Sequence, residues 1–234
     1  MNYTSRLIEA RLKKRYKRFL ADVKLANGNI ITVHCANTGA MTGCQPENAR
    51  VWLSESENKN RKYPHSWELV ELENNALACI NTGLTNKIVE EAINQHLISE
   101  LQGYTHCRKE VVYGDEKSRI DFLLMRENEQ CFLEVKHVTL KLDHQTGAFP
   151  DAVSKRGQKH LRELISQVDR GHRAVMLFVV MRTDIASLVP ADNIDPDYGQ
   201  LLRQAMNAGV EVLAYKANIN LQSIKIEKQI PVLL

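Results

Sequence analysis

A change of pattern near residue 85 is the feature that most constrains how this chain can fold. Before it, short segments alternate apolar and polar residues and are separated by turn-forming residues. After it, segments with helical spacing of apolar residues alternate with buried strand-like runs. Two folding classes in one chain indicate two domains. We therefore predict an all-β domain over residues 1–84 and an α/β domain over residues 85–234.

The first domain is predicted to be a small antiparallel barrel. Asn27-Gly28 is a strong signal for a tight hairpin between the first two expected strands. About five strands in some eighty residues suggest a barrel or sandwich, and the OB-type barrel is one of the few closures available at that size. The expected strands cover residues 19–25, 30–35, 51–53, 67–72 and 76–80.

The second domain is predicted to be a mixed sheet with helices on both faces. Asp195-Pro196 is a typical helix start, with Asp as the cap and Pro in the first turn, and Gly103 is expected to end the first helix. The expected elements are a helix over 86–101, strands over 109–113, 118–125 and 131–140, a helix over 158–168, a strand over 174–181, a helix from 195 and a last strand over 210–215.

Several classes of protein are disfavoured. The longest apolar run, residues 174–181, is far shorter than the roughly 20 residues of a membrane helix, and the N-terminus lacks the pattern of a signal peptide. The five cysteines include no C-x-x-C pair, which favours reduced thiols over a zinc site. Gly39 and Gly43 lack the spacing and lysine of a phosphate-binding loop, so no nucleotide cofactor is expected. We predict a cytoplasmic protein with no membrane partner; the oligomeric state stays open.

Positive charge is concentrated at the start of the chain. Residues 1–20 hold seven basic side chains and one acid, so this segment carries +6 in a chain whose net charge is +3. Aromatic residues interleaved with cations permit base stacking as well as phosphate contact, whereas the alternative is a solvated strand edge. The predicted DNA-binding residues are Arg11, Lys13, Arg15, Lys17, Arg18, Arg61, Lys62, Lys155, Arg156 and Lys159.

The strongest candidate for chemistry is a set of three charged residues on two neighbouring strands. If the turn is centred between Glu127 and Asn128, Asp121 and Glu134 face each other, and like charges opposed on a ladder are destabilising. Lys136 points to the same face as Glu134. A Mg²⁺ or Mn²⁺ ion between the carboxylates would resolve the repulsion and leave coordination positions for phosphate oxygens. The alternative is a simple ion cluster on an exposed hairpin.

Two further residues are candidates. Gln158 is expected in the first turn of a helix among basic groups, where phosphate binds favourably, although an ordinary solvated helix start has the same pattern. Glu100 is expected near the apolar face of its helix, an awkward place for an unpaired carboxylate. It either joins the other acids or pairs with a Lys or Arg at the edge of the core.

The order of elements, with Asp121 followed by Glu134-x-Lys136, resembles the PD-(D/E)XK nuclease fold. Longer blocks resemble the bacterial sugar fermentation stimulation protein family: RYKRFL at 15–20, HCANTG at 34–39, RKY at 61–63, EVK at 134–136, FPDA at 149–152 and GQKHL at 157–161. The resemblance implies a DNA-binding protein with an OB-like and a nuclease-like domain, linked to regulation of maltose metabolism. It also implies that Asp121 and Glu134 bind metal, with Glu100 as a further ligand, that Lys136 is catalytic, and that Gln158 supports catalysis.

Two main hypotheses follow. The first is a Mg²⁺-dependent DNA phosphodiesterase that uses Asp121, Glu134 and Lys136. The second is a regulatory DNA-binding protein whose nuclease-like site does not cut; fold resemblance does not distinguish them. Both predict DNA binding that is largely independent of sequence, because no helix-turn-helix pattern is evident. A sugar-metabolising enzyme is a third, weaker hypothesis.

Overall fold

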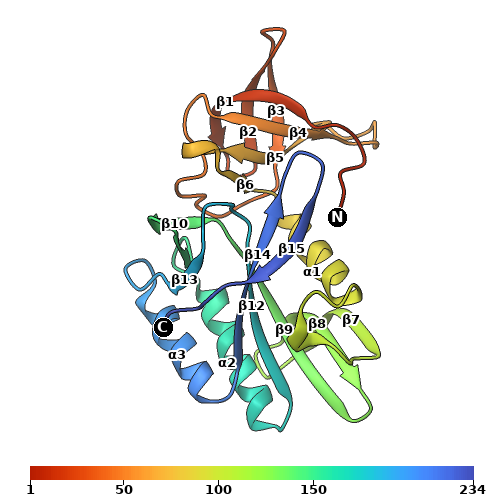
Figure 1. Cartoon of the computed structure of the whole chain (residues 1–234), viewed down its shortest axis with the longest axis vertical. Helices are drawn as coiled ribbons and strands as arrows, with labels where there is room; N and C mark the ends of the chain where they lie inside the picture. The colour runs from red at the N-terminus through yellow and green to blue at the C-terminus, as the bar shows by residue number, and fades with distance from the viewer.

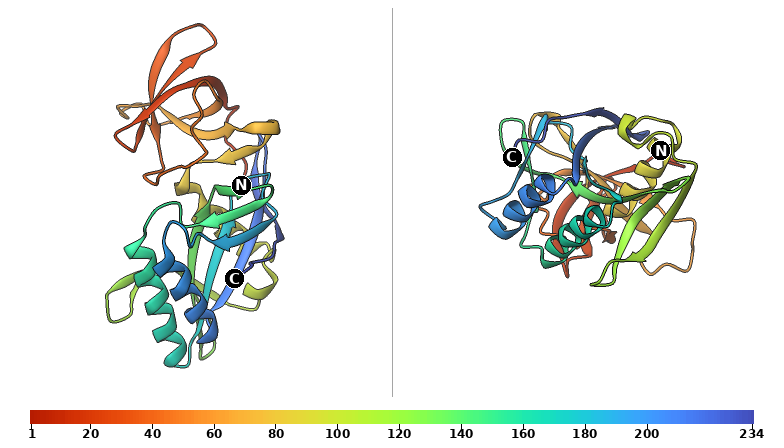
Figure 2. Two further views of the ribbon diagram at one scale, coloured as in Figure 1. Left: turned by 90° about the vertical axis from the view of Figure 1, so that its left-hand side faces the viewer. Right: turned by 90° about the horizontal axis from the view of Figure 1, so that it is seen from below.

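The structure, a computed structural model that describes residues 1–234, consists of two domains stacked along the long axis of the molecule (Figure 1). The β-barrel lies at one end, and the α/β domain lies at the other. Figure 2 shows that the helices belong to the α/β domain and that the barrel is built of strands.

The first domain is a closed five-stranded barrel. The strand order is β3-β2-β1-β4-β5-β6, and a further parallel pairing of β3 with β5 closes the ring. Its core contains Trp67, which is fully buried. The predicted OB-like barrel is confirmed. The strands are β1 (Ile8–Tyr16), β2 (Leu20–Leu25), β3 (Ile30–Cys35), β4 (Arg50–Glu55), β5 (His65–Glu71) and β6 (Leu77–Cys79).

The strand list for the barrel was wrong in one respect. The basic stretch was not predicted as a strand, yet it forms most of β1, where Ala10 and Leu12 point into the barrel. A register shift between Leu12 and Lys14 interrupts the alternation of inward- and outward-facing residues in β1. The strand pattern is therefore visible in the sequence over only a few residues. The expected strand at 76–80 is β6, which extends the edge of β5 outside the closed ring.

The second domain is built on a six-stranded mixed sheet in the order β15-β14-β12-β9-β8-β7. The pairings of β12 with β9 and β14 are parallel, and the others are antiparallel. The strands are β7 (His106–Tyr113), β8 (Ser118–Arg126), β9 (Glu129–Val138), β12 (Arg173–Val180), β14 (Glu211–Ile219) and β15 (Ile224–Gln229). A small sheet beside it contains β10 (Leu140–Asp143), β11 (Thr146–Phe149) and β13 (Ser187–Pro190).

Helices cover both faces of the large sheet, as expected. Ile88 of α1 packs in one cluster with Phe122 and Val135, whereas Leu161 of α2 packs on the opposite face with Phe132. The α/β class of this domain is confirmed. The helices are α1 (Thr85–Asn94), α2 (Lys155–Asp169) and α3 (Pro196–Asn207), with short 3₁₀ turns η1 (Glu73–Asn75), η2 (Thr82–Leu84) and η3 (Ser99–Leu101).

Several predicted boundaries need correction. The helix predicted over 86–101 ends at Asn94, because the chain turns at His96, whose φ is +57°. The strand predicted over 131–140 is divided between β9 and β10, and β15 follows the strand expected to be last. The helix start at Asp195-Pro196 is confirmed, since the Asp195 side chain accepts a hydrogen bond from the Tyr198 N–H.

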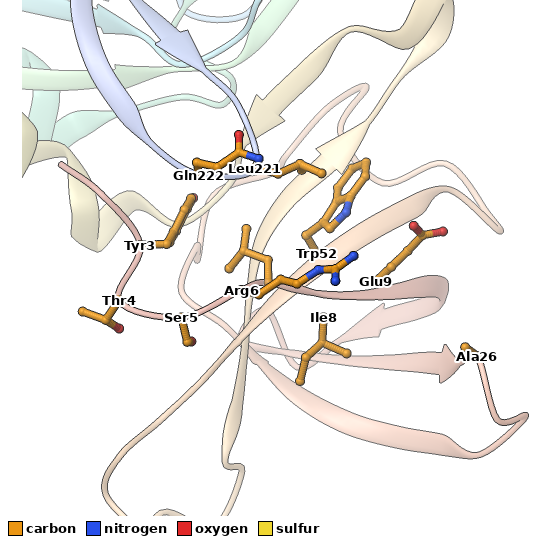
Figure 3. Close-up of a pocket in the computed structure, with 11 residues that line it drawn as sticks. Tyr3, Thr4, Ser5, Arg6, Ile8, Glu9, Ala26, Trp52, Leu221 and Gln222 are labelled. Atoms are coloured by element: carbon orange, nitrogen blue, oxygen red, sulfur yellow. The ribbon is translucent and has the colours of Figure 1, made fainter.

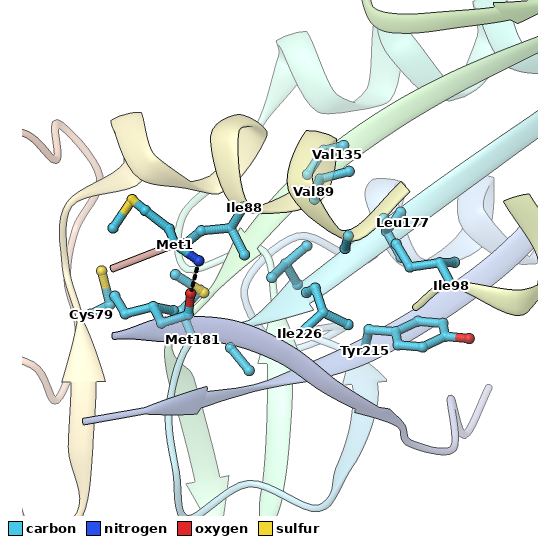
Figure 4. Packing of buried hydrophobic residues seen from close by; sticks show 14 of the residues in the cluster. Met1, Cys79, Ile88, Val89, Ile98, Val135, Leu177, Met181, Tyr215 and Ile226 are labelled. Carbon is cyan, nitrogen blue, oxygen red and sulfur yellow. Dashed lines mark hydrogen bonds between the residues drawn. The ribbon is translucent and has the colours of Figure 1, made fainter. Parts of the chain in front are cut away.

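The two domains share apolar packing. One buried cluster contains Trp52 and Leu69 of the barrel together with α1 and the large sheet. Figure 4 shows part of this cluster, including Met1 and Met181. The Met1 amino group donates to the Ile224 carbonyl, so the first residues of the chain lie against the second domain. None of the helices is long and apolar enough to cross a membrane.

Candidate active site

The hairpin formed by β8 and β9 positions the predicted acidic pair. Arg126 pairs with Glu129 across a two-residue turn, and the same register continues to Phe122 and Leu133. Asp121 and Glu134 occupy the next positions on the two strands. At this point the Asp121 carboxylate accepts a hydrogen bond from the Val135 N–H at 2.8 Å. A side-chain oxygen of β8, rather than a backbone carbonyl, is therefore the acceptor for this N–H of β9.

Asp121 is held at two points. In addition to the Val135 N–H, its second oxygen accepts a hydrogen bond from the Asn86 side chain at 2.8 Å. Burial and the neighbouring Glu134 carboxylate raise the pKa of Asp121 above its usual value. Asn86, in the first turn of α1, was not a predicted site residue, and nothing in its local sequence marks it as one.

Glu134 is buried, with 3% of its side chain exposed, and only one of its two oxygens is satisfied. Oε1 accepts from Lys136 Nζ at 2.5 Å and is also hydrogen-bonded to His160 Nδ1 of α2. Oε2 is buried without any hydrogen-bond partner. Burial alone raises the pKa of Glu134, but Lys136 and His160 together lower it below its usual value. The carboxylate is thus held in its charged form.

His160 links the acidic pair to a surface cation. Its Nδ1 faces Glu134, and its Nε2 lies 3.4 Å from Arg156 Nε. A neutral His160 with its proton on Nδ1 donates to the carboxylate and accepts from Arg156, which satisfies both contacts. His160 therefore fixes the position of Glu134 and links it to Arg156 at the start of α2.

These residues fit a hard divalent cation. A buried carboxylate oxygen without a partner is unfavourable, and a cation at Glu134 Oε2 would remove that penalty. The Asp121 oxygens accept one hydrogen bond each, which leaves each of them a lone pair. The chain contains no group of three His, Cys, Asp or Glu residues placed to bind metal. A cation here would complete its coordination with water or substrate oxygens, as Mg²⁺ commonly does.

The three charged residues face a cavity of about 370 Å³. One wall comes from the connection between the domains and the start of α1, and the other comes from β9 and Arg156. Such a cavity can admit a phosphate group beside the acidic pair. Its lining residues are Thr82, Gly83, Thr85, Asn86, Asp121, Glu134, Val135, Lys136, His137 and Arg156.

Gln158 and Glu100 do not join this set. The Gln158 amide donates to Asp195 at 2.8 Å, so it connects α2 to the cap of α3. Glu100 accepts from the Tyr215 hydroxyl at 2.7 Å and lies in η3, beyond the end of α1. Neither residue lines the cavity. The expected helix 86–101 would have carried Glu100 on the face of α1, but the turn at His96 redirects the chain.

Most of the predicted DNA-binding residues at the start of the chain form hydrogen bonds that fix loops of the barrel. Arg15 donates to the carbonyls of Arg18, Asn37 and Gly39, at 2.7, 2.9 and 2.9 Å. Arg18 donates to the Thr38 carbonyl. Both Arg11 and Lys13 contact Asn48, whereas Lys17 is exposed in the turn between β1 and β2.

The five remaining predicted DNA-binding residues lie near residues 61–66 of the barrel and at the start of α2. Arg61 donates to Ser66, and Lys62 lies over the Tyr63 ring. Lys155 pairs with Asp197 at 3.5 Å, and Lys159 donates to the Glu116 carbonyl. Of the ten, Arg156 alone lines the cavity of the acidic pair.

A larger cavity, of about 750 Å³, lies elsewhere (Figure 3). It is bounded by the N-terminal segment, Trp52 and the turn between β14 and β15. Its only acid, Glu9, is paired with Arg50 at 3.0 Å. Without a second acid, this groove cannot hold a cation between two carboxylates as the acidic pair can.

Comparisons with known proteins give a consistent result for both domains. Residues 83–223 match the model of the sugar fermentation stimulation protein RE domain, and residues 14–80 match that of the SfsA N-terminal OB domain. A sugar fermentation stimulation protein homolog from Shewanella frigidimarina is 52% identical over the full length of both chains. A homolog from Marinomonas sp. is 49% identical over all of this chain and 91% of the relative.

A solved structure resembles the whole chain. The structure of Pyrococcus furiosus SfsA in complex with Ca²⁺ has a TM-score of 0.88 and 26% sequence identity. The match covers 100% of this chain and 98% of that one. The arrangement of both domains is therefore shared with that protein.

Proposed function

This chain belongs to the sugar fermentation stimulation protein family, and on that basis we propose that it binds DNA and hydrolyses phosphodiester bonds with a divalent cation held by Asp121 and Glu134. The nuclease-like fold of the second domain supports the proposal. The observation that carries it is the Glu134 Oε2 atom, buried without a partner beside Asp121 and Lys136. The relative from Pyrococcus furiosus was solved in complex with Ca²⁺, also a hard divalent cation.

Each side chain has a distinct part in this proposal. Asp121 and Glu134 hold the cation, and when bound it supplies charge for a scissile phosphate and lowers the pKa of a bound water. Asn86 and the Val135 N–H orient Asp121, while His160 orients Glu134. These contacts fix both carboxylates before substrate arrives, as efficient catalysis requires.

Lys136 and Arg156 provide the positive charge of the chain itself. The Lys136 side chain is 14% exposed, and its ammonium lies 2.5 Å from Glu134. From this position it stabilises negative charge that develops on the phosphate, or it orients a water for attack. Arg156 lines the same cavity and is exposed, so it can contact a phosphate oxygen directly.

A cleavage assay tests the proposal. Purified protein is incubated with plasmid and with single-stranded DNA, with Mg²⁺, with Mn²⁺ or with EDTA. We expect metal-dependent cleavage by the wild type and a loss of about 10² or more in Glu134→Gln. Glu127→Gln, an exposed acid in the turn of the same hairpin, is the matched control and should cut normally. Equal activity in both variants would refute the assignment.

A second candidate is DNA binding without cleavage, and one observation favours it. Lys136 already pairs with Glu134, and His160 is hydrogen-bonded to the same carboxylate oxygen, so the site can remain folded without a cation. This candidate predicts DNA binding by the wild type with no cleavage under any metal condition.

We further propose that DNA binding is the step through which this protein affects maltose metabolism, the role implied by the family resemblance. Arg156→Ala, introduced into a strain that lacks the native copy, should then impair growth on maltose in proportion to its loss of DNA affinity. Normal growth with a variant that no longer binds DNA would contradict this link.

A further inference from the structure

A second cavity, of about 230 Å³, lies at the junction of the two domains and adjoins the active site. The two cavities share Thr82 and His137 in their walls. A ligand that reaches from one to the other would pass these two residues. The lining residues of the junction cavity are Asn37, Thr38, Gly39, Thr82, His137, Val138, Thr139, Leu140, Ala148, Phe149 and Asp151.

Contacts between the domains build this cavity. The Met41 N–H donates to Asp151 at 3.0 Å, which joins the barrel loop to the segment before α2. The guanidinium of Arg15 fixes the same loop through the carbonyls of Asn37 and Gly39. A Cβ at Gly39 would lie 3.0 Å from Asn37 Oδ1 and 3.1 Å from Asp151 Oδ2, so glycine permits this close approach.

Three polar groups in the cavity wall have no hydrogen-bond partner within the protein. Asn37 is 6% exposed; its oxygen accepts from the Gly39 N–H, but its amide nitrogen donates to no protein atom. Thr139 is 7% exposed, and its hydroxyl makes no hydrogen bond in the structure. Oδ1 of Asp151 also accepts no hydrogen bond, whereas Oδ2 accepts one from the Met41 N–H. None of these atoms is sealed from solvent, so each can bind water or a ligand that enters the cavity.

The chemistry of the wall selects the class of ligand. It offers a donor from Asn37, an acceptor from Asp151, a hydroxyl that can be either, and the ring of Phe149. No Lys or Arg lines the cavity, and the Asp151 carboxylate repels anions, so a phosphate is disfavoured. A planar, uncharged ligand with donors and acceptors along its edge is favoured, and a nucleobase has these properties.

We propose that the junction cavity binds the base of an unpaired nucleotide next to the phosphate in the active site. This inference rests on the proposed function, since it places the phosphate beside Asp121 and Glu134. Bases stacked in an intact duplex cannot reach such a cavity unless they are flipped out. Single-stranded DNA, or duplex with an unpaired nucleotide, is therefore the preferred substrate.

Binding measurements in EDTA separate this inference from catalysis. Fluorescence anisotropy is recorded with three labelled DNAs of related sequence: an intact duplex, the duplex with one unpaired nucleotide, and the single strand. The wild type should bind the two unpaired forms about tenfold or more tightly than the intact duplex, because flipping costs a few kcal/mol.

Variants of the cavity wall make the test specific. Thr139→Val keeps the side-chain shape and removes the hydroxyl; it should weaken binding of the unpaired forms about three- to tenfold and leave the intact duplex unaffected. Thr38→Trp places a bulky side chain at an exposed position of the wall and should abolish the preference. Thr105→Val, outside both cavities, is the control, and thermal melting verifies that each variant is folded.

The outcomes distinguish the two proposals. A preference for unpaired DNA that Thr139→Val and Thr38→Trp reduce, without cleavage in Mg²⁺, would support the base site and refute catalysis. Equal affinity of the wild type for all three DNAs, or variants that retain its preference, would overturn the base site even if the protein cuts DNA.

Discussion

Mg²⁺ or Mn²⁺ should raise the melting temperature of the wild-type protein, and Glu134→Gln should abolish that rise. Asp121 and Glu134 are adjacent acids, and the proximity of Glu134 contributes to the raised pKa of Asp121. A cation that binds the folded site, and has no comparable site in the unfolded chain, stabilises the folded state by mass action.

The expected rise in melting temperature follows from the concentration of free cation relative to its dissociation constant. At a free concentration 100 times that constant, the free energy of unfolding rises by about 2.7 kcal/mol. For domains of 150–250 residues each kcal/mol shifts the melting temperature by roughly 2–4 °C, so a rise of about 5–10 °C is expected. In Glu134→Gln the neutral amide removes one of the two charged ligands while Asp121 keeps its contacts to Asn86 and Val135.

The assay is differential scanning calorimetry across a series of Mg²⁺ and Mn²⁺ concentrations. Glu100→Gln is an informative control, because this acid lies in η3 beside Tyr215 and outside the cavity, and it should keep the full rise. If the wild type shows no rise at saturating Mn²⁺, or if Glu134→Gln shows the same rise as the wild type, the reasoning about the acidic pair is wrong.

Three further predictions concern Lys136, the exposed cations Lys17 and Arg156, and Asp184. Lys136→Ala should lower cleavage by about 10² while DNA affinity stays nearly constant; titration and single-turnover cleavage on one DNA measure both, and a parallel loss of affinity would reduce Lys136 to a phosphate contact. Lys17→Ala and Arg156→Ala should each reduce the slope of DNA affinity against salt concentration, on a log–log plot, by about 1 in magnitude. Arg15→Ala should instead mainly lower the stability of the protein, because Arg15 holds the loop at residues 37–39. An unchanged slope in both Lys17→Ala and Arg156→Ala would place the DNA-binding surface elsewhere. Burial alone raises the pKa of Asp184, but hydrogen bonds from Arg182 and Lys141 lower it below its usual value. The charged Asp184 therefore stabilises the folded state above the pKa of an unfolded Asp, near 4, and this stabilisation is lost as the pH falls through the lower pKa of the folded state. In urea titrations, Asp184→Asn should lower the free energy of unfolding by about 1 kcal/mol at pH 7. The difference in free energy of unfolding between variant and wild type should shrink toward pH 3.

The facing arrangement of Asp121 and Glu134 was predictable because it depends only on the position and length of the hairpin turn between them. A two-residue turn at Glu127-Asn128 fixes the register of the hairpin, and the register places Asp121 opposite Glu134. The residues that orient the pair were not predictable in this way. Asn86 lies 35 residues from Asp121, and His160 lies 26 residues from Glu134. Their contacts depend on how α1 and α2 pack on the sheet.

The basic stretch at the start of the chain shows a different limit of sequence reasoning. Its charge density predicted phosphate contacts, but charge does not reveal what a guanidinium touches. Arg15 donates to three carbonyls, and two of them, those of Asn37 and Gly39, belong to a loop more than twenty residues away. The loop lacks regular backbone pairing, so its carbonyls need donors, and Arg15 supplies them. The same charge pattern also concealed the strand β1.

The central claim is that Asp121 and Glu134 together hold a divalent cation that engages a DNA phosphate. Anomalous diffraction from crystals of the protein grown with Mn²⁺ and a short single-stranded oligonucleotide tests it most directly. We predict one strong manganese peak bound by oxygens of both carboxylates, with a phosphate oxygen in its coordination shell and Lys136 beside that phosphate. A manganese peak at any other cluster of acids, or an oligonucleotide bound with no metal at this pair, would contradict the claim.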